Sequence, residues 1–432
     1  MFTKILIANR GEIAVRIIRA CKEMGIATVA VYSQADADTL AVALADESIC
    51  IGSALPEDSY LNEQRILSAA LAVNATAIHP GYGFLSERES FAELCEQNGI
   101  VFIGPSGAVM RALSDKAKSK EQMAAAGLPV IPGSMAVMNA DQAVAYAAEI
   151  GYPIMLKARS GGGGRGIRVI ASEEQMRQIY ETAAAESLAA FGDAALYVEK
   201  YVYPARHIEV QILADEEGGV LCLGERDCSV QRRHQKLIEE SPSPGVTDEQ
   251  RQYLMQICKK AVQTLGYVGV GTLEFLLDAE GHFWFMEMNL RLQVEHGVTE
   301  MLTRTDLVKW QIRTAAGVCV PKKEIFLDGA CIECRINARS TGRIEILHIP
   351  GGPFVRFDTW MVQGMEVSPY YDSLLGKLIV YAGTREEALR KMRAALCELV
   401  IEGVETNLAE QLELIETAEF SDGSYDLRLL EA

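Results

Sequence analysis

Apolar and polar residues follow two distinct periods along the first hundred positions. Short apolar runs at Lys4–Ala8 and Ala27–Tyr32 flank a segment, Gly11–Glu23, in which apolar residues recur at helical spacing. Two more apolar runs, Ala77–His79 and Val101–Ile103, are each followed by a Gly/Pro break. Runs of this length predict buried strands, and the spacing between them predicts an amphipathic helix. The alternation predicts a doubly wound α/β unit at the N-terminus.

The pattern changes several times after this unit. A helix-rich connector near 114–126 ends at Leu128-Pro129, and residues from about 131 to 203 read as a small α/β unit. Residues 210–311 are strand-rich and then helical, and the chain from Ala330 is strand-rich again before two final helices. We therefore predict an α/β protein, α+β in its central part, with domains at 1–113, 114–329 and 330–432 and a small α/β unit near 131–203 within the second.

Composition narrows the function classes. The 432 residues are 49% hydrophobic and 23% charged, with a net charge of −18, which argues against nucleic-acid binding. No apolar run is long enough to cross a bilayer, and the start of the chain is a poor signal peptide. Ten scattered cysteines predict reduced thiols and a cytoplasmic location, and the lone pair Cys331 and Cys334 predicts buried thiols rather than a metal site.

A glycine-rich loop is the first candidate for chemistry. Residues 158–166 carry four consecutive glycines between the predicted strands Ile154–Lys157 and Ile167–Ile170. Such a hairpin tip can close its backbone N–H groups over phosphates, with Lys157 and Lys116 as cationic partners. A mobile surface hairpin with solvated lysines is the alternative, and the loop is not a Walker A motif.

Two later strands carry a candidate metal site. A two-residue turn at Glu280-Gly281 would place Glu274 opposite Glu287, and Asn289 would lie on the same strand face. Facing carboxylates destabilise a ladder unless a cation lies between them. Two carboxylates and an amide oxygen suit Mg²⁺ or Mn²⁺ bound with a nucleotide, whereas a solvated acidic face is the alternative.

An anion and base cluster continues from this strand. Arg291, Gln293 and Glu295 extend the i, i+2 spacing, and Lys236 adds a second cation. Arg291 can hold a small oxyanion with its planar fork, and Glu295 can act as a base. A structural salt-bridge network is the alternative.

These residues together resemble the biotin carboxylase family of the ATP-grasp superfamily over essentially the whole chain. Single motifs are weak, but their order is specific. The matching segments are Ile7–Ala14, Ile78–Glu87, Glu225–Ser229, Gln231–Lys236, Glu287–Asn289, Gln293–His296 and Glu333–Asn337.

The resemblance implies a role for each candidate. Residues around ATP would be Lys116, Lys157, Gly163, Gly164, Glu199, Lys200, Tyr201, Val202, His207, Gln231, His234, Glu274 and Glu287. Two Mg²⁺ or Mn²⁺ ions would be held by Glu274, Glu287 and Asn289. Bicarbonate would be held by Lys236, Arg291, Gln293 and Val294, and deprotonated by Glu295. Arg335 would stabilise the biotin enolate in a pocket lined by Tyr82 and Gly83.

The resemblance also implies partners. The implied domains are an N-terminal Rossmann-like domain, an ATP-grasp domain with a mobile glycine-rich lid near 131–203, and a C-terminal biotin carboxylase domain. The biotin would be carried by a biotin carboxyl carrier protein, and carboxyltransferase subunits would complete an acetyl-CoA carboxylase. A homodimer is expected, with Arg16 and Asp372 at its contact. The alternatives are a subunit of another acyl-CoA or 2-oxoacid carboxylase, another ATP-grasp ligase, and an impaired paralogue acting in assembly.

Four features depart from the family pattern. Leu290 replaces a threonine and is expected to face away from the metal, and Gly297 replaces a proline, which is expected to loosen the turn after His296. Arg159-Ser160 replace small residues before the glycines, and the segment 338–343 is shortened soon after Arg335. These positions motivate the hypothesis of an impaired paralogue.

Overall fold

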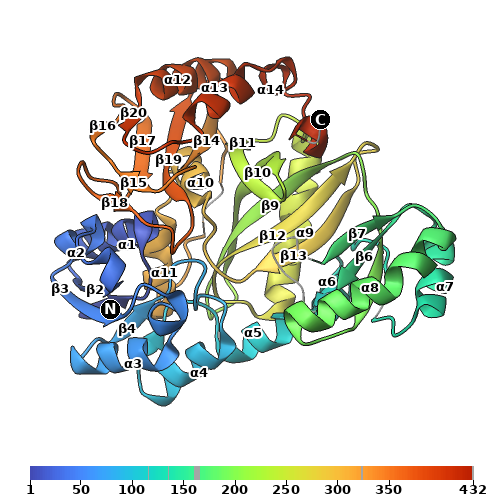
Figure 1. Cartoon of the computed structure of the whole chain (residues 1–432), viewed down its shortest axis with the longest axis horizontal. Helices are drawn as coiled ribbons and strands as arrows, with labels where there is room; N and C mark the ends of the chain where they lie inside the picture. The colour runs from blue at the N-terminus through green and yellow to red at the C-terminus, as the bar shows by residue number, and fades with distance from the viewer. Residues whose placement is uncertain (115, 135, 160–165, 323–324, 431–432) are drawn as a thin grey trace.

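The computed structural model describes the whole chain except residues 115, 135, 160–165, 323–324 and 431–432. Its N-terminal part, at the lower left of Figure 1, is a parallel sheet in the order β3-β2-β1-β4-β5. The strands are β1 Lys4–Ile7, β2 Ala27–Ser33, β3 Glu47–Gly52, β4 Ala77–His79 and β5 Val101–Phe102. The helices of this part are α1 Gly11–Glu23, α2 Leu40–Leu44, α3 Glu63–Ala72, α4 Glu89–Gln97 and α5 Gly107–Ser114. The predicted doubly wound unit is confirmed.

A small three-stranded sheet lies at the right of Figure 1. Its order is β7-β6-β8, and both pairs are antiparallel. Its strands are β6 Ile154–Ala158, β7 Ile167–Ile170 and β8 Leu196–Lys200, and the neighbouring helices are α6 Lys116–Ala125, α7 Ala140–Ile150 and α8 Glu173–Phe191. The strands predicted on either side of the glycine run therefore pair with each other. The run itself, with Gly163 and Gly164, lies outside the described residues.

The centre of the molecule is an eight-stranded antiparallel sheet in the order β13-β12-β9-β10-β11-β14-β19-β17. Its strands are β9 Ala205–Ala214, β10 Val220–Arg232, β11 Gln235–Ser241, β12 Gly269–Asp278, β13 Phe283–Asn289, β14 Ala330–Asn337, β17 Val355–Thr359 and β19 Leu374–Ala382. The sheet crosses position 330 through the pairing of β11 with β14. The limits 113/114 and 329/330 stay predictions.

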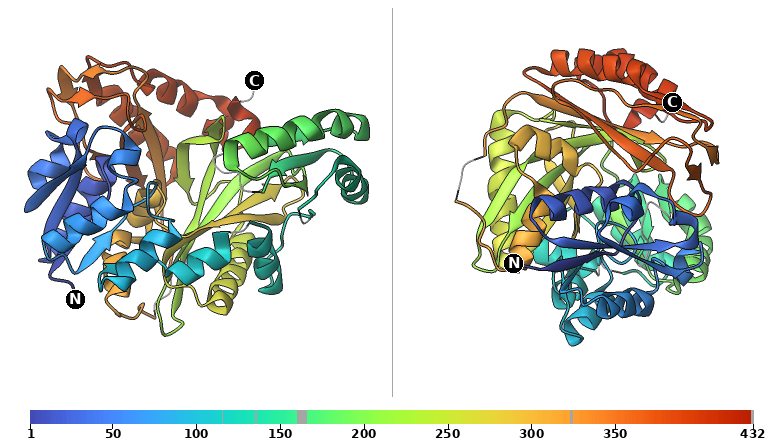
Figure 2. Two further views of the ribbon diagram at one scale, coloured as in Figure 1. Left: turned by 60° about the horizontal axis from the view of Figure 1, so that its bottom comes forward. Right: turned by 90° about the vertical axis from the view of Figure 1, so that its left-hand side faces the viewer.

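Helices cover this sheet on both sides, as the two views of Figure 2 show. They are α9 Asp248–Leu265, α10 His296–Thr303, α11 Leu307–Ala315, α12 Arg385–Glu398, α13 Leu408–Glu416 and α14 Ala418–Asp422. Short strands complete the C-terminal part: β15 Gly342–Arg343, β16 Ile346–His348, β18 Glu366–Val367 and β20 Val400–Glu402. None of the described helices is long and apolar enough to cross a membrane.

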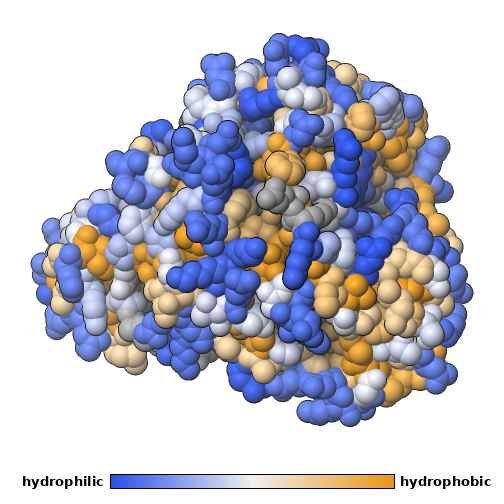
Figure 3. All heavy atoms as spheres, turned by 180° about the vertical axis from the view of Figure 1, so that it is seen from behind, coloured by the Kyte–Doolittle hydropathy of each residue, from blue (hydrophilic) through white to orange (hydrophobic). Residues whose placement is uncertain are grey.

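The outer surface mixes hydrophilic and hydrophobic residues, as Figure 3 shows for the face behind Figure 1. The charged residues are not confined to this surface. Lys377, fully buried on β19, lies with its Nζ 3.0 Å from Oε1 of Glu12 on α1 and donates a 2.6 Å hydrogen bond to the carbonyl of Val294. Glu300 on α10 pairs with Arg16 at 2.9 Å and with Arg356 at 2.8 Å. Buried ion pairs thus join the N-terminal helix to the segment after β13.

The hairpin of β12 and β13 corrects one prediction. Glu274 does pair with Glu287, but the loop has three residues, because Asp278 and His282 are joined by a 3.0 Å backbone hydrogen bond. A register shift after Glu274 offsets the extra loop residue. The predicted two-residue turn is therefore wrong, and a bulge restores the predicted partners.

Candidate active site

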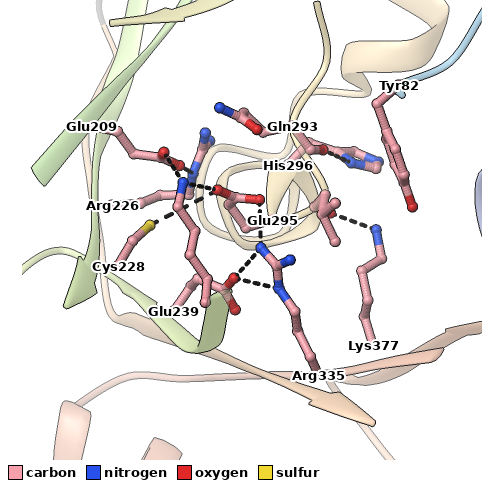
Figure 4. A network of polar contacts seen from close by, with 12 residues as sticks. Tyr82, Glu209, Arg226, Cys228, Glu239, Gln293, Glu295, His296, Arg335 and Lys377 are labelled. Carbon is pink, nitrogen blue, oxygen red and sulfur yellow. Dashed lines mark hydrogen bonds and ion pairs between the residues drawn. The ribbon is translucent and has the colours of Figure 1, made fainter. Parts of the chain in front are cut away.

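Glu295 lies at the centre of a network of polar contacts, shown in Figure 4. It is fully buried at the N-terminus of α10. Its Oε1 is 2.6 Å from Nζ of Lys236 on β11, and its Oε2 is 3.0 Å from Nη2 of Arg335 on β14. Burial alone would raise the pKa of Glu295, but the charges of Lys236, Arg335 and Arg226 bring it well below its usual range. The side chain is a carboxylate held between cations.

Lys236 is held by three carboxylates. Besides Glu295, it contacts Glu209 at 2.7 Å and Glu274 at 3.3 Å. Burial would lower the pKa of the ammonium, but the surrounding acidic groups raise it well above its usual value. Arg226, itself fully buried, fixes Glu209 through a 2.6 Å ion pair. The side chain of Lys236 is therefore a charged ammonium whose position is fixed among these carboxylates.

Arg335 extends from β14 toward Glu295. Its Nε donates to Oε1 of Glu239 at 2.6 Å, while its Nη2 also contacts Glu295 (Figure 4). Burial raises the pKa of Glu239 to about 7, against the opposing charge of Arg335. The guanidinium thus lies between two buried carboxylates and is anchored on both sides.

Glu274 gathers a second set of polar groups. Its Oε1 accepts hydrogen bonds from Nδ2 of Asn289 at 2.8 Å and Nε2 of Gln293 at 3.0 Å, and its Oε2 is 3.2 Å from Nε2 of His207. His207 in turn contacts Gln231 at 2.7 Å. Burial would raise the pKa of Glu274, but Lys236 and His207 lower it, so the carboxylate is charged.

The segment after β13 differs from the prediction that Arg291, Gln293 and Glu295 extend the spacing of the strand. The strand ends at Asn289, and Glu295 is the N-cap residue of α10, so the i, i+2 spacing does not continue along a strand. Leu290 and Leu292 are buried and Arg291 is partly exposed, but Gln293 and Glu295 are buried too, so the alternation ends at Leu292. Arg291 contacts Asn289 at 3.1 Å and Gln293 at 2.9 Å, which keeps the predicted cluster together.

The residues expected around the nucleotide differ in their surroundings, and only some of them have described side-chain contacts. Lys157 on β6 pairs with Glu199 on β8, and Lys120 on α6, which we did not predict, pairs with the same carboxylate. Lys200 bonds the carbonyl of Gly151 at 2.8 Å. Tyr201 and Val202 continue beyond the strand end, and Lys116 begins α6, with a side chain outside the described residues. His234 is exposed at the tip between β10 and β11, with a positive φ of 64°.

Tyr82 and Gly83 lie on the side of the site that faces the N-terminal sheet. The hydroxyl of Tyr82 donates to Glu12, the residue that also pairs with Lys377. Tyr82 and Lys377 lie side by side in Figure 4. Gly83 is exposed and has a positive φ of 66°. The loop therefore borders the Arg335 side of the site through its contact with α1.

Known protein families match this chain over almost its whole length. Family models match residues 1–110 (biotin carboxylase, N-terminal domain), 115–323 (carbamoyl-phosphate synthase L chain, ATP binding domain) and 333–432 (biotin carboxylase C-terminal domain). The chain is 48% identical to biotin carboxylase 1 of Bacillus subtilis, covering 100% of this chain and 98% of that protein. This chain belongs to the biotin carboxylase family.

Solved structures give the same result. The biotin carboxylase of Campylobacter jejuni, in a complex with β-γ-ATP, matches with a TM-score of 0.98 and 48% identity, covering 100% of this chain and 99% of that one. The biotin carboxylase domain dimer of the Hydrogenobacter thermophilus 2-oxoglutarate carboxylase, which holds MgADP and bicarbonate, matches with a TM-score of 0.96 and 49% identity, covering 100% and 97%. The chain is thus an enzyme of the biotin carboxylase family.

Two departures from the biotin carboxylase pattern have structural explanations. Leu290 is buried in an apolar cluster with Met288, and its backbone N–H donates to Glu87 at 3.0 Å. Gly297 lies in the first turn of α10 rather than in a loose turn, and a Cβ there would collide with Cδ1 of Ile379. Ile379 on β19 thus occupies the space beside Gly297. Arg159 pairs with Asp193 at 2.9 Å, and Ser160 lies outside the described residues.

Several residues of this biotin carboxylase site were not predicted. Glu209, Arg226 and Glu239 hold the catalytic candidates, and Glu87 holds Arg291 at 3.0 Å. Glu87 and Arg226 lie within the matching motifs, so the motifs were the available signal. The two cysteines, Cys331 and Cys334, are buried as predicted, and burial raises the pKa of both thiols.

Proposed function

We propose that this chain carboxylates biotin on a carrier protein, using ATP and bicarbonate, as the biotin carboxylase subunit of an acetyl-CoA carboxylase. The observation that supports the chemistry most directly is the placement of Glu295 between Lys236 and Arg335, at 2.6 and 3.0 Å. A carboxylate base, a cation beside it for an anionic substrate and a second cation for a later intermediate are what this reaction needs.

The first chemical step is the activation of bicarbonate. Bicarbonate bound by Lys236, Arg291, Gln293 and the backbone of Val294 loses its proton to Glu295. The dianion attacks the γ-phosphorus of ATP, the bond to the β-phosphate oxygen breaks, and carboxyphosphate and ADP form. Lys236 and Arg291 offset the charge that builds up on the oxygens in this step.

The second step transfers the carboxyl group. Carboxyphosphate separates into CO₂ and phosphate, and phosphate takes the N1 proton of biotin. Arg335 stabilises the resulting enolate oxygen, and N1 attacks CO₂ to give carboxybiotin. Tyr82 and Gly83 line the biotin side, and exclusion of water from the site would protect carboxyphosphate from hydrolysis.

A divalent cation fits beside this machinery. Glu274 and Glu287 face each other in the ladder, and Asn289 follows on the same strand, which provides the oxygen donors that Mg²⁺ or Mn²⁺ takes. When bound, the ions neutralise phosphate charge and orient the γ-phosphate.

The relatives support a set of partner proteins for this reaction. A separate biotin carboxyl carrier protein would bring the biotin, and carboxyltransferase subunits would receive the carboxyl group in the cytoplasm. The homologue crystallised as a dimer supports a homodimer. Arg16, which pairs with Asp306 at 2.7 Å, and exposed Asp372 are the proposed contact residues. Since one relative is the 2-oxoglutarate carboxylase small subunit, a 2-oxoacid carboxylase is the second candidate.

The test is capture of labelled carboxybiotin. The purified chain with Mg²⁺, ATP and ¹⁴C-bicarbonate is expected to form acid-labile labelled carboxybiotin from free biotin, with one ATP hydrolysed for each carboxyl group transferred. Transfer from the carboxylated carrier to acetyl-CoA or to a 2-oxoacid by matching carboxyltransferases then separates the two settings. Absence of biotin-dependent turnover in a sample that binds ATP would contradict the proposal.

Replacing Glu274 by glutamine tests the metal assignment. We expect the Mg²⁺ concentration for half-maximal turnover to rise by about 10- to 100-fold, because one anionic oxygen donor is lost. Turnover is measured across a Mg²⁺ titration at fixed free ATP. Glu280→Gln, in the exposed loop of the same hairpin, is the control and should leave the titration unchanged. An unchanged Mg²⁺ titration in Glu274→Gln would remove Glu274 from the metal site.

A further inference from the structure

Strands β11 and β14 separate where they carry the two central cations. Their antiparallel register runs from Ser241 opposite Cys331 to Ile238 opposite Cys334, and among the described residues it ends there. Leu237 and Arg335 come next on the two strands. Lys236 and Arg335 therefore extend from strand segments that no longer pair directly with each other.

A buried amide bridges this gap. Gln411 on α13 is fully buried, and its Nε2 donates to the carbonyl of Leu237 at 3.1 Å and to the carbonyl of Arg335 at 2.8 Å. Both partners are acceptors, so the orientation of the amide is fixed by its two donors. One side chain thus replaces the missing ladder contact between the two strands.

Asn407, immediately before α13, supports the same carbonyl. Its Nδ2 donates to Arg335 at 3.0 Å, and its Oδ1 accepts the N–H of Asn337 at 2.7 Å. It is 3% exposed. The backbone carbonyl of Arg335 therefore receives two side-chain donors from one turn of chain, which fixes the strand at the residue whose guanidinium meets Glu295.

The same helix turn also reaches the surface. Glu410 pairs with Arg232, at the end of β10, and with Arg339, in the shortened segment after β14. The turn thus connects the β10–β11 hairpin, which carries Lys236, to the chain that leaves Arg335. In this protein these contacts support the region where the family pattern has a longer loop.

We infer that Gln411 and Asn407 are positioning residues for carboxylation, holding Lys236 and Arg335 at the spacing at which both meet Glu295. This inference rests on the proposed function. Neither residue touches the reacting atoms; each acts through the backbone of a strand. Since displacement of a catalytic group by about 1 Å can cost about 100-fold in rate, loss of the bridge should affect catalysis more than ATP binding.

The test compares Gln411→Met and Asn407→Asp with Leu414→Ala. The first variant keeps the length of the side chain but removes both donors, and the second removes the donor to Arg335 while keeping the acceptor for Asn337. Leu414 is buried on the same helix and packs in its apolar core, so its truncation loosens α13 without touching the bridge. All three are compared below their unfolding temperatures with the wild-type chain.

We expect kcat/KM for free biotin to fall by about 10- to 100-fold in Gln411→Met and in Asn407→Asp, with the Kd for ATP within about twofold of wild type. Leu414→Ala should lower the unfolding temperature and keep kcat/KM. Amide hydrogen exchange should quicken in β11 and β14 of the two bridge variants only. If one bridge variant fails to fold, the other decides the result.

Unchanged kcat/KM and unchanged exchange in a folded bridge variant would overturn the inference, as would an equal loss of kcat/KM in Leu414→Ala. Failure of the proposed function looks different, because the wild-type chain itself would then give no carboxybiotin. In that case the exchange of β11 and β14 decides whether the bridge exists, and faster exchange restricted to the bridge variants would support it.

Discussion

Replacing Glu295 by glutamine is expected to lower biotin carboxylation by about 10²- to 10⁴-fold, the contribution typical of a positioned general base. The substitution keeps the size of the side chain but removes the carboxylate that lies 2.6 Å from Lys236 and 3.0 Å from Arg335. The affinity for ATP should change little. Steady-state carboxybiotin formation and equilibrium binding of ATP are the two measurements.

The low pKa of Glu295 raises a question about its role as a base, and the surrounding charges answer it. In the structure, Lys236, Arg335 and Arg226 outweigh the effect of burial and hold the carboxylate in its charged form. Bound bicarbonate brings a negative charge beside Lys236, so the net field on Glu295 becomes less positive and its pKa rises. The base is therefore expected to gain strength when its substrate arrives.

Glu300→Gln is a matched control for Glu295→Gln. Glu300 lies on the same helix, is buried, and pairs with Arg16 and Arg356 rather than with the central cations. Its loss should reduce thermal stability and leave turnover within about threefold, since it lies outside the reacting cluster. Near-normal turnover in Glu295→Gln, or an equal loss in the control, would remove Glu295 from the base role.

Sequence patterns predicted correctly those features that depend on residues close together in the chain. Apolar periodicity predicted α1 with both of its observed ends and the strands around the glycine run. The pairing of Glu274 with Glu287 was predicted correctly through an incorrect turn, since a bulge compensates for the longer loop. A compensation of this kind depends on how the hairpin packs and leaves no clear signal in the residue order.

Long-range partners could not be predicted in this way. Arg226 meets Glu209 because β9 and β10 pair, and Gln411 meets Leu237 across 174 positions of chain. The residue types alone did not identify these contacts, because any buried arginine needs some acceptor and the register decides which one. Spacing and motifs therefore identified the groups that are proposed to do the chemistry, and the structure identified the groups that hold them.

Replacing Arg335 by methionine is expected to lower biotin-dependent carboxylation by about 10²- to 10³-fold, the cost typical of removing a donor that stabilises a developing oxyanion. ATP hydrolysis that depends on bicarbonate but not on biotin should survive to a greater extent, because Lys236 and Arg291 remain. Carboxybiotin formation and phosphate release without biotin are measured on the same samples. Equal loss of both activities would place Arg335 in the bicarbonate step instead.

The lysine variant separates charge from geometry at this position. Arg335 anchors Glu239 with Nε and reaches Glu295 with Nη2, a fork that a lysine cannot reproduce. Arg335→Lys should therefore retain the field on Glu295 but lose most of the biotin-dependent rate. Arg339→Lys, four residues further on and exposed, is the matched control and should retain that rate. A fully active Arg335→Lys would mean that positive charge alone suffices at the biotin side of the site.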